Sequence, residues 1–129
     1  PVIASHSNAR GECFHLRNLS DEMIRQLAER GGVTGINFCP SFLREEEPAA
    51  KKASTMDMVR HMKYLRNVGG IDIIGLGTDF DGFSGETDVP DTAHMQHLAD
   101  VMSHDGFTDE EIEKVFSKNV LRVFRECWK

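Results

Sequence analysis

The sequence predicts an α/β fold whose strands run parallel. Three short apolar runs each lead into polar residues, and each run is followed by a stretch with helical periodicity. Such alternation implies crossover connections between the strands, and therefore parallel strands. At 129 residues, with 40% hydrophobic and 28% charged residues, the chain has the composition of one globular domain.

The first strand and helix are predicted at the start of the chain. Residues 1–5 (PVIAS) form an apolar run typical of strands that are buried on both faces, and polar residues follow from His6. Ser20 precedes two acidic residues and is the predicted N-cap of a helix. Apolar residues then recur on one helical face until Gly31 and Gly32, where we expect the helix to end.

The second unit repeats this order. Residues 33–38 (VTGINF) read as a strand that ends before Cys39-Pro40, and residues 44–52 (REEEPAAKK) as a charged, proline-interrupted loop. Ser54 and Asp57 form a variant of the capping box, which predicts that a helix begins there. We expect this helix to end at Gly69-Gly70.

The third unit contains the clearest strand, residues 71–77 (IDIIGLG), which leads into the sequence TDFDG. A helix is predicted over residues 92–103. The strongest helix signal comes last, because Thr108-x-x-Glu111 is a capping box ahead of a periodic apolar face. That face consists of Ile112, Val115, Phe116, Asn119, Val120 and Val123.

Charge and composition exclude several classes of partner. The net charge is -6, and Lys51-Lys52 is the longest basic run, so the sequence predicts no nucleic-acid partner. No apolar stretch approaches the roughly 20 residues that span a bilayer, so we expect no membrane segment in this chain. Its three cysteines are an odd, widely spaced set, which argues against a disulfide framework and favours a reducing compartment.

Polar residues follow all three predicted strands. They are His6, the segment 37–41 and Asp79. In parallel α/β folds, barrels included, the carboxyl ends of the strands are the edge where functional sites are built. The layout, about three βα units with a further terminal helix, resembles three-eighths of a TIM-like (β/α)8 barrel.

Five segments carry a more specific resemblance. PVIASHS, the pair Arg17-Asn18, GINF, GLGTDFDG and KNVLRVF occur in this order along nearly the whole chain. Together they resemble the C-terminal part of the membrane dipeptidase family, also called renal dipeptidases, which are zinc peptidases on a TIM-like barrel. The resemblance implies that residues 1–129 are the C-terminal fragment of a single metallopeptidase barrel domain, and that residue 1 is an internal position of a longer protein.

The resemblance also implies a role for each of three residues. His6 matches a histidine that binds one of two Zn2+ ions, Arg17 matches the arginine that holds the terminal carboxylate of the dipeptide substrate, and Asp79 matches the aspartate that contacts substrate and transfers a proton. The family's other metal ligands lie upstream of Pro1. We therefore expect zinc-dependent hydrolysis of dipeptides from the complete protein, with this fragment inactive by itself.

The residues alone leave alternatives open. A histidine after a strand is more often a structural residue than a ligand. Asp79 and Asp81 could both be merely turn-forming acids ahead of Gly82, and because strand alternation would aim both to one side, their spacing does not separate them. His94 and His97 could meet a surface metal, but a solvated helix face is the better interpretation. The family pattern selects His6 and Asp79.

Two hypotheses of different classes follow. The first is a metallo-dipeptidase, cytoplasmic and of bacterial type rather than secreted or membrane-anchored, whose missing N-terminal portion completes the barrel. The second is a non-enzymatic α/β fragment that lacks a complete metal site and self-associates through its open strand edges.

Overall fold

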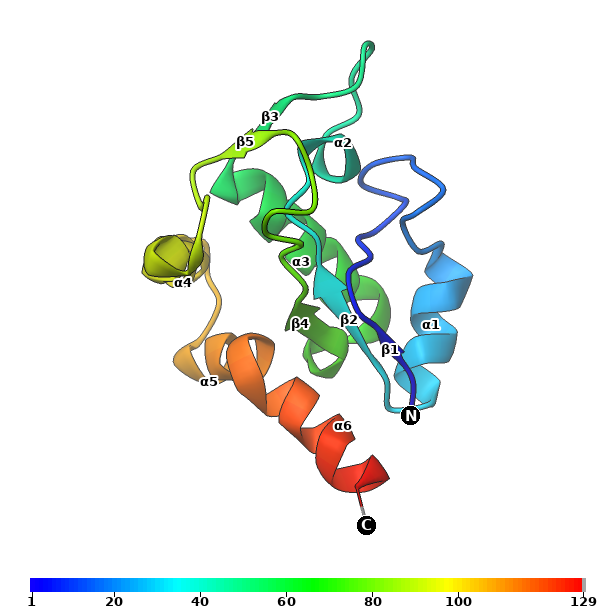
Figure 1. Ribbon diagram of the computed structural model, residues 1–129. Coiled ribbons are helices and arrows are strands. Elements are labelled where there is room, and N and C mark those ends of the chain that lie inside the picture. The colour runs from blue at the N-terminus through cyan, green and yellow to red at the C-terminus, as the bar shows by residue number, and fades with distance from the viewer. Residues whose placement is uncertain (129) are drawn as a thin grey trace.

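The computed structural model describes residues 1–128, which form strands and helices in alternation (Figure 1). In chain order, these are β1 (Ile3–Ala4), α1 (Asp21–Glu29), β2 (Val33–Ile36), α2 (Pro40–Leu43), β3 (Lys52–Ala53), α3 (Thr55–Gly69), β4 (Ile74–Leu76), β5 (Glu86–Thr87), α4 (Met95–His104), α5 (Asp109–Glu113) and α6 (Asn119–Cys127).

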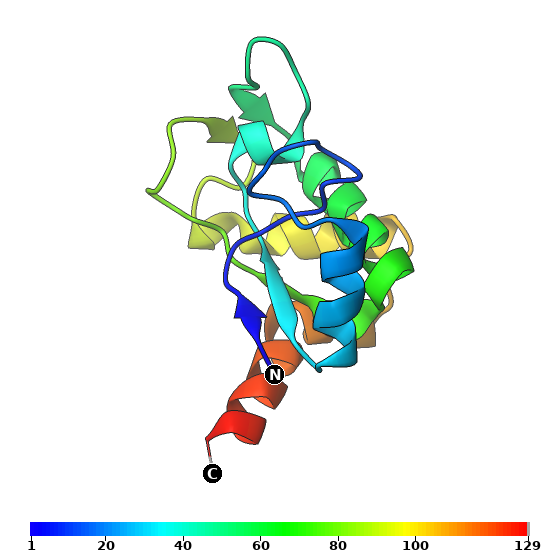
Figure 2. The ribbon, with the colours of Figure 1, turned by 90° about the vertical axis from the view of Figure 1, so that its right-hand side faces the viewer.

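The main sheet within this part of the chain has three parallel strands in the order β1-β2-β4. Ile3 pairs with Val33, and Thr34 pairs with Ile74. Helices α1 and α3 pack against each other beside the sheet, while α6 contacts β2 and β4 near the N-terminal ends of the strands (Figures 1 and 2). The predicted α/β class and parallel strand direction are therefore confirmed.

Three details of the strands differ from the prediction. β1 is an edge strand of two residues, and Val2 and Ile3 are 55% and 39% exposed, so the expected burial on both faces was wrong. The run predicted as the third strand begins with a 3₁₀ turn, and only Ile74–Leu76 are strand. β3 lies at the end of the segment predicted as a loop and pairs with β5, because backbone groups of two surface loops meet there.

Three of the predicted helix starts are confirmed by their caps, whereas the helix predicted from residue 92 begins with a 3₁₀ turn, and α4 itself begins at Met95 without a side-chain cap. The Ser20 hydroxyl accepts the N–H of Met23 at α1. Reciprocal capping boxes begin α3, with Ser54 and Asp57, and α5, with Thr108 and Glu111. The last predicted helix is interrupted by a π-helical turn at Lys114–Lys118, which separates α5 from α6.

The core lies between the sheet and its helices. It joins apolar side chains of β2 and β4 with the inward faces of α1, α3 and α4. Its largest fully buried members are Ile24, Ile36, Phe38, Met58, Met62, Leu65, Ile74, Leu98 and Met102. Burial of this kind stabilises each helix far more than its own hydrogen bonds do.

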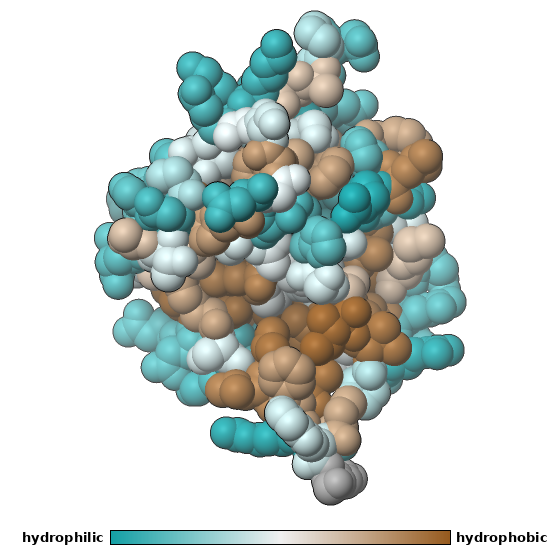
Figure 3. Space-filling model, viewed as in Figure 1, coloured by the Kyte–Doolittle hydropathy of each residue, from teal (hydrophilic) through white to brown (hydrophobic). Residues whose placement is uncertain are grey.

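One face of the molecule stays apolar at its surface. Figure 3 shows a brown patch over β1 and α6. The exposed apolar side chains of these two elements and the residues beside them are Val2, Ile3, Leu121, Phe124 and Trp128. We call these five residues the apolar face.

Candidate functional site

The carboxyl ends of the three parallel strands meet at one edge of the sheet. His6 follows β1, Asn37 follows β2 and Asp79 follows β4. The Asn37 side-chain amide lies 3.3 Å from Asp79 Oδ2 and 3.5 Å from the His6 carbonyl oxygen. The structure thus brings two of the three predicted site residues to a common neighbour.

Two glycines allow the flanking strands to converge over β2. A Cβ atom on Gly77 would lie 1.9 Å from the Ser5 carbonyl oxygen, and one on Gly35 would lie 2.3 Å from the same oxygen. No side chain fits in either gap. The chain therefore passes from β1 to His6, and from β4 to Asp79, in close backbone contact.

Arg17 and His6 are in direct contact. Arg17 Nη2 donates a hydrogen bond to His6 Nε2 across 3.1 Å, so the lone pair of this neutral imidazole lies on Nε2. The proton is then on Nδ1, which lies 2.6 Å from Ser5 Oγ and donates to it. Metal-binding histidines use the same tautomeric arrangement, in which one ring nitrogen donates its N–H to a neighbouring group and the other carries the lone pair that binds the metal.

The Arg17 guanidinium also stacks on an aromatic ring. Its guanidinium carbon lies 5.4 Å from the centre of the Phe42 ring, within the range of a cation–π contact. The His15 ring lies 4.5 Å from the Phe42 ring, and His15 Nδ1 accepts the backbone N–H of Arg17. Although Arg17 is exposed, its position is therefore restricted on two sides.

Asp79 occupies an unusual backbone conformation. Its φ is 60°, in the left-handed region that non-glycine residues rarely adopt, and its carbonyl accepts the N–H of Gly82 at 2.9 Å. A Cβ on Gly82 would lie 2.1 Å from Asp79 Oδ1, so the carboxylate fits only because residue 82 is glycine. Together with Asn37, this turn fixes where the carboxylate points.

Asp81 lies apart from that contact. It also has a positive φ, 66°, but its side chain is exposed and borders a hollow of about 220 Å³ that Phe80 and Phe83 also line. Asn37 donates a hydrogen bond to Asp79 and not to Asp81. The structure therefore distinguishes the two aspartates, which their positions in the sequence could not do.

Buried asparagines connect the loop that carries Arg17 to the rest of the site. We call residues 7–19 the arginine loop. Asn8 exchanges two hydrogen bonds with the Asn37 backbone, at 2.9 and 2.7 Å. Asn18 donates to the carbonyls of Cys13 and Phe42, and its side-chain oxygen accepts the N–H of Asn8. Sequence reasoning gave Asn8 and Asn18 no role, although Asn18 directly follows Arg17 and Asn8 lies two residues after His6.

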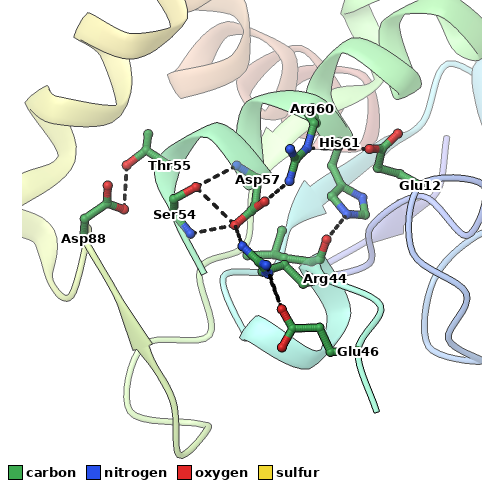
Figure 4. Close-up of polar contacts among 10 residues, drawn as sticks. Glu12, Arg44, Glu46, Ser54, Thr55, Asp57, Arg60, His61 and Asp88 are labelled. Atoms are coloured by element: carbon green, nitrogen blue, oxygen red, sulfur yellow. Dashed lines mark hydrogen bonds and ion pairs between the residues drawn. The ribbon is translucent and has the colours of Figure 1, made fainter. Parts of the chain in front are cut away.

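Ion pairs connect helix α3 to the arginine loop and to Arg44, the residue after α2 (Figure 4). Asp57, which is buried, accepts from Ser54 and forms ion pairs with Arg60 and Arg44. Arg60 also reaches Glu12 in the arginine loop, at 3.7 Å. Buried carboxylates need such partners, because an unpaired charge in the interior is strongly unfavourable.

The described residues hold part of a metal site at most. Within residues 1–128, no group of three or more His, Cys, Asp or Glu side chains could hold a metal ion. His94 and His97 pair with Asp91 and Asp88 on the surface, in agreement with a solvated helix face. Cys13, Cys39 and Cys127 are free thiols. Across the same residues, each helix is too short or too polar to cross a membrane.

Comparison with known sequences links the whole described chain to one family. The family model described as membrane dipeptidase (peptidase family M19) matches residues 1–128. Dipeptidase tcpJ of Claviceps purpurea is 35% identical over 127 residues, which are 98% of this chain and 29% of that protein. A Klebsiella pneumoniae protein named for the pqqA 5′ region is 35% identical over 128 residues, or 99% of this chain and 47% of that protein.

Solved structures agree. A metallopeptidase named dipeptidase AC superposes with a TM-score of 0.92 at 30% identity, covering 99% of this chain and 38% of that one. A metallopeptidase from Rhodobacter sphaeroides, liganded with a phosphinate mimic of the dipeptide L-Ala-D-Ala, superposes with a TM-score of 0.90 at 30% identity, covering 97% and 36%. The chain therefore spans between 29% and 47% of the length of these relatives.

Proposed function

Because this chain belongs to the membrane dipeptidase family of metallopeptidases, we propose that it is the C-terminal portion of a zinc-dependent dipeptidase built on a TIM-like (β/α)8 barrel. The observation that carries the proposal is that Arg17 contacts the His6 imidazole, and that Asn37 bonds both the His6 backbone carbonyl and the Asp79 carboxylate at the carboxyl edge of the sheet. The chain then supplies one metal ligand, one substrate-binding residue and one catalytic residue.

His6 is the proposed metal ligand. Its Nδ1–H is engaged by Ser5, and the lone pair on Nε2 that now accepts from Arg17 is the one that zinc would need. Since residues 1–128 hold no complete ligand set, the remaining ligands of two zinc ions come from the missing N-terminal portion. Zinc bound there would lower the pKa of a coordinated water and polarise the scissile carbonyl.

Arg17 is the proposed carboxylate-binding residue. A guanidinium presents two parallel N–H groups to a carboxylate, which pairs it with the free C-terminus of a dipeptide. Phe42 and His15 keep that fork in place while leaving it accessible. This contact would require a free carboxylate on the residue that follows the scissile bond. A dipeptide has its C-terminus there, whereas an interior bond of a long chain is followed by another peptide group.

Asp79 is the proposed proton-transfer residue. A carboxylate can take a proton from the attacking water and return it to the leaving amine. Asn37 donates to Asp79 Oδ2, which orients the carboxylate in the turn that follows β4. The left-handed backbone of Asp79 supports this role, since strained conformations concentrate at functional sites.

The apolar face supports the proposal that an N-terminal portion of the protein packs against β1 and α6. Contiguous exposed apolar surface of this kind marks an interface, and β1 presents an unpaired strand edge beside it. The missing N-terminal portion would cover both. The three free thiols suit a reducing compartment and support a cytoplasmic enzyme.

The test compares the complete protein with this chain alone. We expect the complete protein to hydrolyse a simple dipeptide such as L-Ala-L-Ala, to lose activity when a chelator removes metal, and to regain it with Zn2+. The isolated chain should show no hydrolysis. Absence of dipeptide hydrolysis by the zinc-loaded complete protein would refute the proposal.

The competing function is a non-enzymatic fragment that self-associates, and the exposed apolar face is the observation in its favour. Sedimentation of the isolated chain together with its metal content decides between the two. Stable oligomers of the 129-residue chain that occur in the cell without an N-terminal portion would favour the fragment.

A further inference from the structure

His61 is a buried polar residue that the proposed chemistry does not use. It lies on the second turn of α3, is fully buried, and is surrounded by core residues of the same helix, including Met58, Met62 and Leu65. Its Nδ1 accepts the backbone N–H of Ala9 at 3.2 Å, and its Nε2–H donates to the Leu43 carbonyl at 3.0 Å, as the dashed line from His61 in Figure 4 shows.

Each backbone group that His61 binds is next to a residue that shapes the candidate site. Ala9 follows Asn8, which binds the Asn37 backbone. Leu43 follows Phe42, whose ring lies under the Arg17 guanidinium. The Phe42 carbonyl in turn accepts from both Asn8 and Asn18. One imidazole therefore joins the arginine loop to the end of α2 at the place where the two segments support Arg17.

We propose that His61 is a positioning residue for substrate binding, because its imidazole fixes the separation between the arginine loop and α2 and thereby the place of Arg17. This inference rests on the proposed role of Arg17 as the carboxylate-binding residue. His61 does not reach the candidate site itself, so it acts through Ala9 and Leu43.

An imidazole suits this task for a chemical reason. A neutral histidine carries one acceptor and one donor on opposite sides of a rigid ring, and here it meets one backbone donor and one backbone acceptor. Burial favours the neutral form, which keeps Nδ1 available as an acceptor at neutral pH. An apolar side chain of similar size would leave the Ala9 N–H and the Leu43 carbonyl without this partner.

The test uses His61→Leu, His61→Gln and a matched control, Met62→Ala, in the complete zinc-loaded protein. Met62 is equally buried one residue along the same helix but forms no polar contact with either loop. We expect His61→Leu to raise KM for a free-carboxylate dipeptide roughly tenfold, with kcat within about twofold of wild type, because misplacing a binding group by a fraction of an ångström weakens binding. Glutamine carries one acceptor and one donor and should restore most of the KM.

A second readout does not depend on activity. Hydrogen exchange at the Ala9 amide should become faster in His61→Leu and stay close to wild type in His61→Gln and Met62→Ala. If His61→Leu does not fold, His61→Asn takes its place, because asparagine is too short to reach both backbone groups and should show the same rise in KM.

The outcomes separate the two proposals. A KM that is unchanged in His61→Leu, or raised equally in Met62→Ala at matched thermal stability, overturns the positioning role. If the wild-type complete protein hydrolyses no dipeptide, the proposed function fails, and exchange at Ala9 still decides whether His61 holds the loop. Faster exchange in the leucine variant with recovery in the glutamine variant supports it, and unchanged exchange overturns it.

Discussion

The carboxyl edge of the sheet and the apolar face differ in how far contacts within the chain satisfy their side chains. At the edge, Asn8, Asn18 and Asn37 satisfy one another and the loop backbone, so Arg17 and Asp79 are held by neighbours within the chain. On the apolar face, Leu121, Phe124 and Trp128 are exposed, and the rings of Phe124 and Trp128 lie 6.4 Å apart. One region is organised by contacts within this chain, whereas we propose that the other is covered by a further portion of the protein.

The largest effect is expected at the organised edge. Asp79→Asn in the complete protein should lower kcat by roughly 10²- to 10⁴-fold, because the amide cannot transfer the proton. Metal content should stay near the wild-type value, since Asp79 is not the proposed ligand. Steady-state kinetics and metal analysis of the purified variant check this, with Asp81→Asn as the matched control. Unchanged turnover would remove Asp79 from the mechanism.

The second effect is on stability, through His61. Burial lowers the pKa of His61 from 6.5 to about 4, so the unfolded chain takes up this proton first as the solution is acidified. The stability from neutral His61 is fully present above about pH 6.5. It is lost progressively as the pH falls to 4, by about 3 kcal/mol in total.

Denaturant unfolding of the complete protein, with chelator in every buffer, measures this loss. Other groups titrate in the same window, so the decisive quantity is the difference between wild type and His61→Gln, which has no titrating group at this position. A difference in unfolding free energy that does not change between pH 7 and pH 4 would contradict the lowered pKa.

The third effect is on substrate affinity. Arg17→Ala should reduce kcat/KM for a free-carboxylate dipeptide by roughly thirtyfold, equivalent to about 2 kcal/mol, because a charge-assisted pair is lost. Dipeptide amides, which lack the charge, should be affected much less. Equal losses on both substrates would exclude a carboxylate-binding role for Arg17.

The smallest effect compares the two regions directly. Trp128 and Leu16 are similarly exposed, at 85% and 81%, but Trp128 belongs to the apolar face and Leu16 to the arginine loop. Trp128→Ser should weaken association of the isolated chain, while Leu16→Ser should not. We expect each variant to change the unfolding free energy by less than about 0.5 kcal/mol. Sedimentation velocity distinguishes them, and equal effects would mean that the apolar face has no special role.

The sequence predicted well what depends on local signals. Caps at Ser20, Ser54 and Thr108 marked helix starts because the cap and the group it binds are a few residues apart. The strand that ends before Asp79 was predicted at its C-terminal end, from the apolar run Ile74–Leu76, but not at its start, which is a 3₁₀ turn. Burial of β1 could not be predicted, because an edge strand and a central strand differ in their neighbours and not in their own sequence.

The candidate site shows the same limit. The three residues could be named because they lie in recognisable short segments, and the structure places Arg17 beside His6 and Asp79 beside Asn37. The role of His61 could not be predicted from sequence, since its partners Ala9 and Leu43 are 52 and 18 residues away along the chain. Backbone partners leave no mark in the residue types on which sequence reasoning depends.

Gly35 and Gly77 show that the spacing of the site depends partly on residues that have no side chain. The Ser5 carbonyl occupies the space that a side chain on either residue would need. A methyl group on Gly77 would move the end of β1 away from the end of β4, and so separate the backbone that leads to His6 from the backbone that leads to Asp79. The positions of the loops that carry His6 and Asp79 therefore depend on glycine at residues 35 and 77. A search confined to chemically active side chains would overlook both glycines.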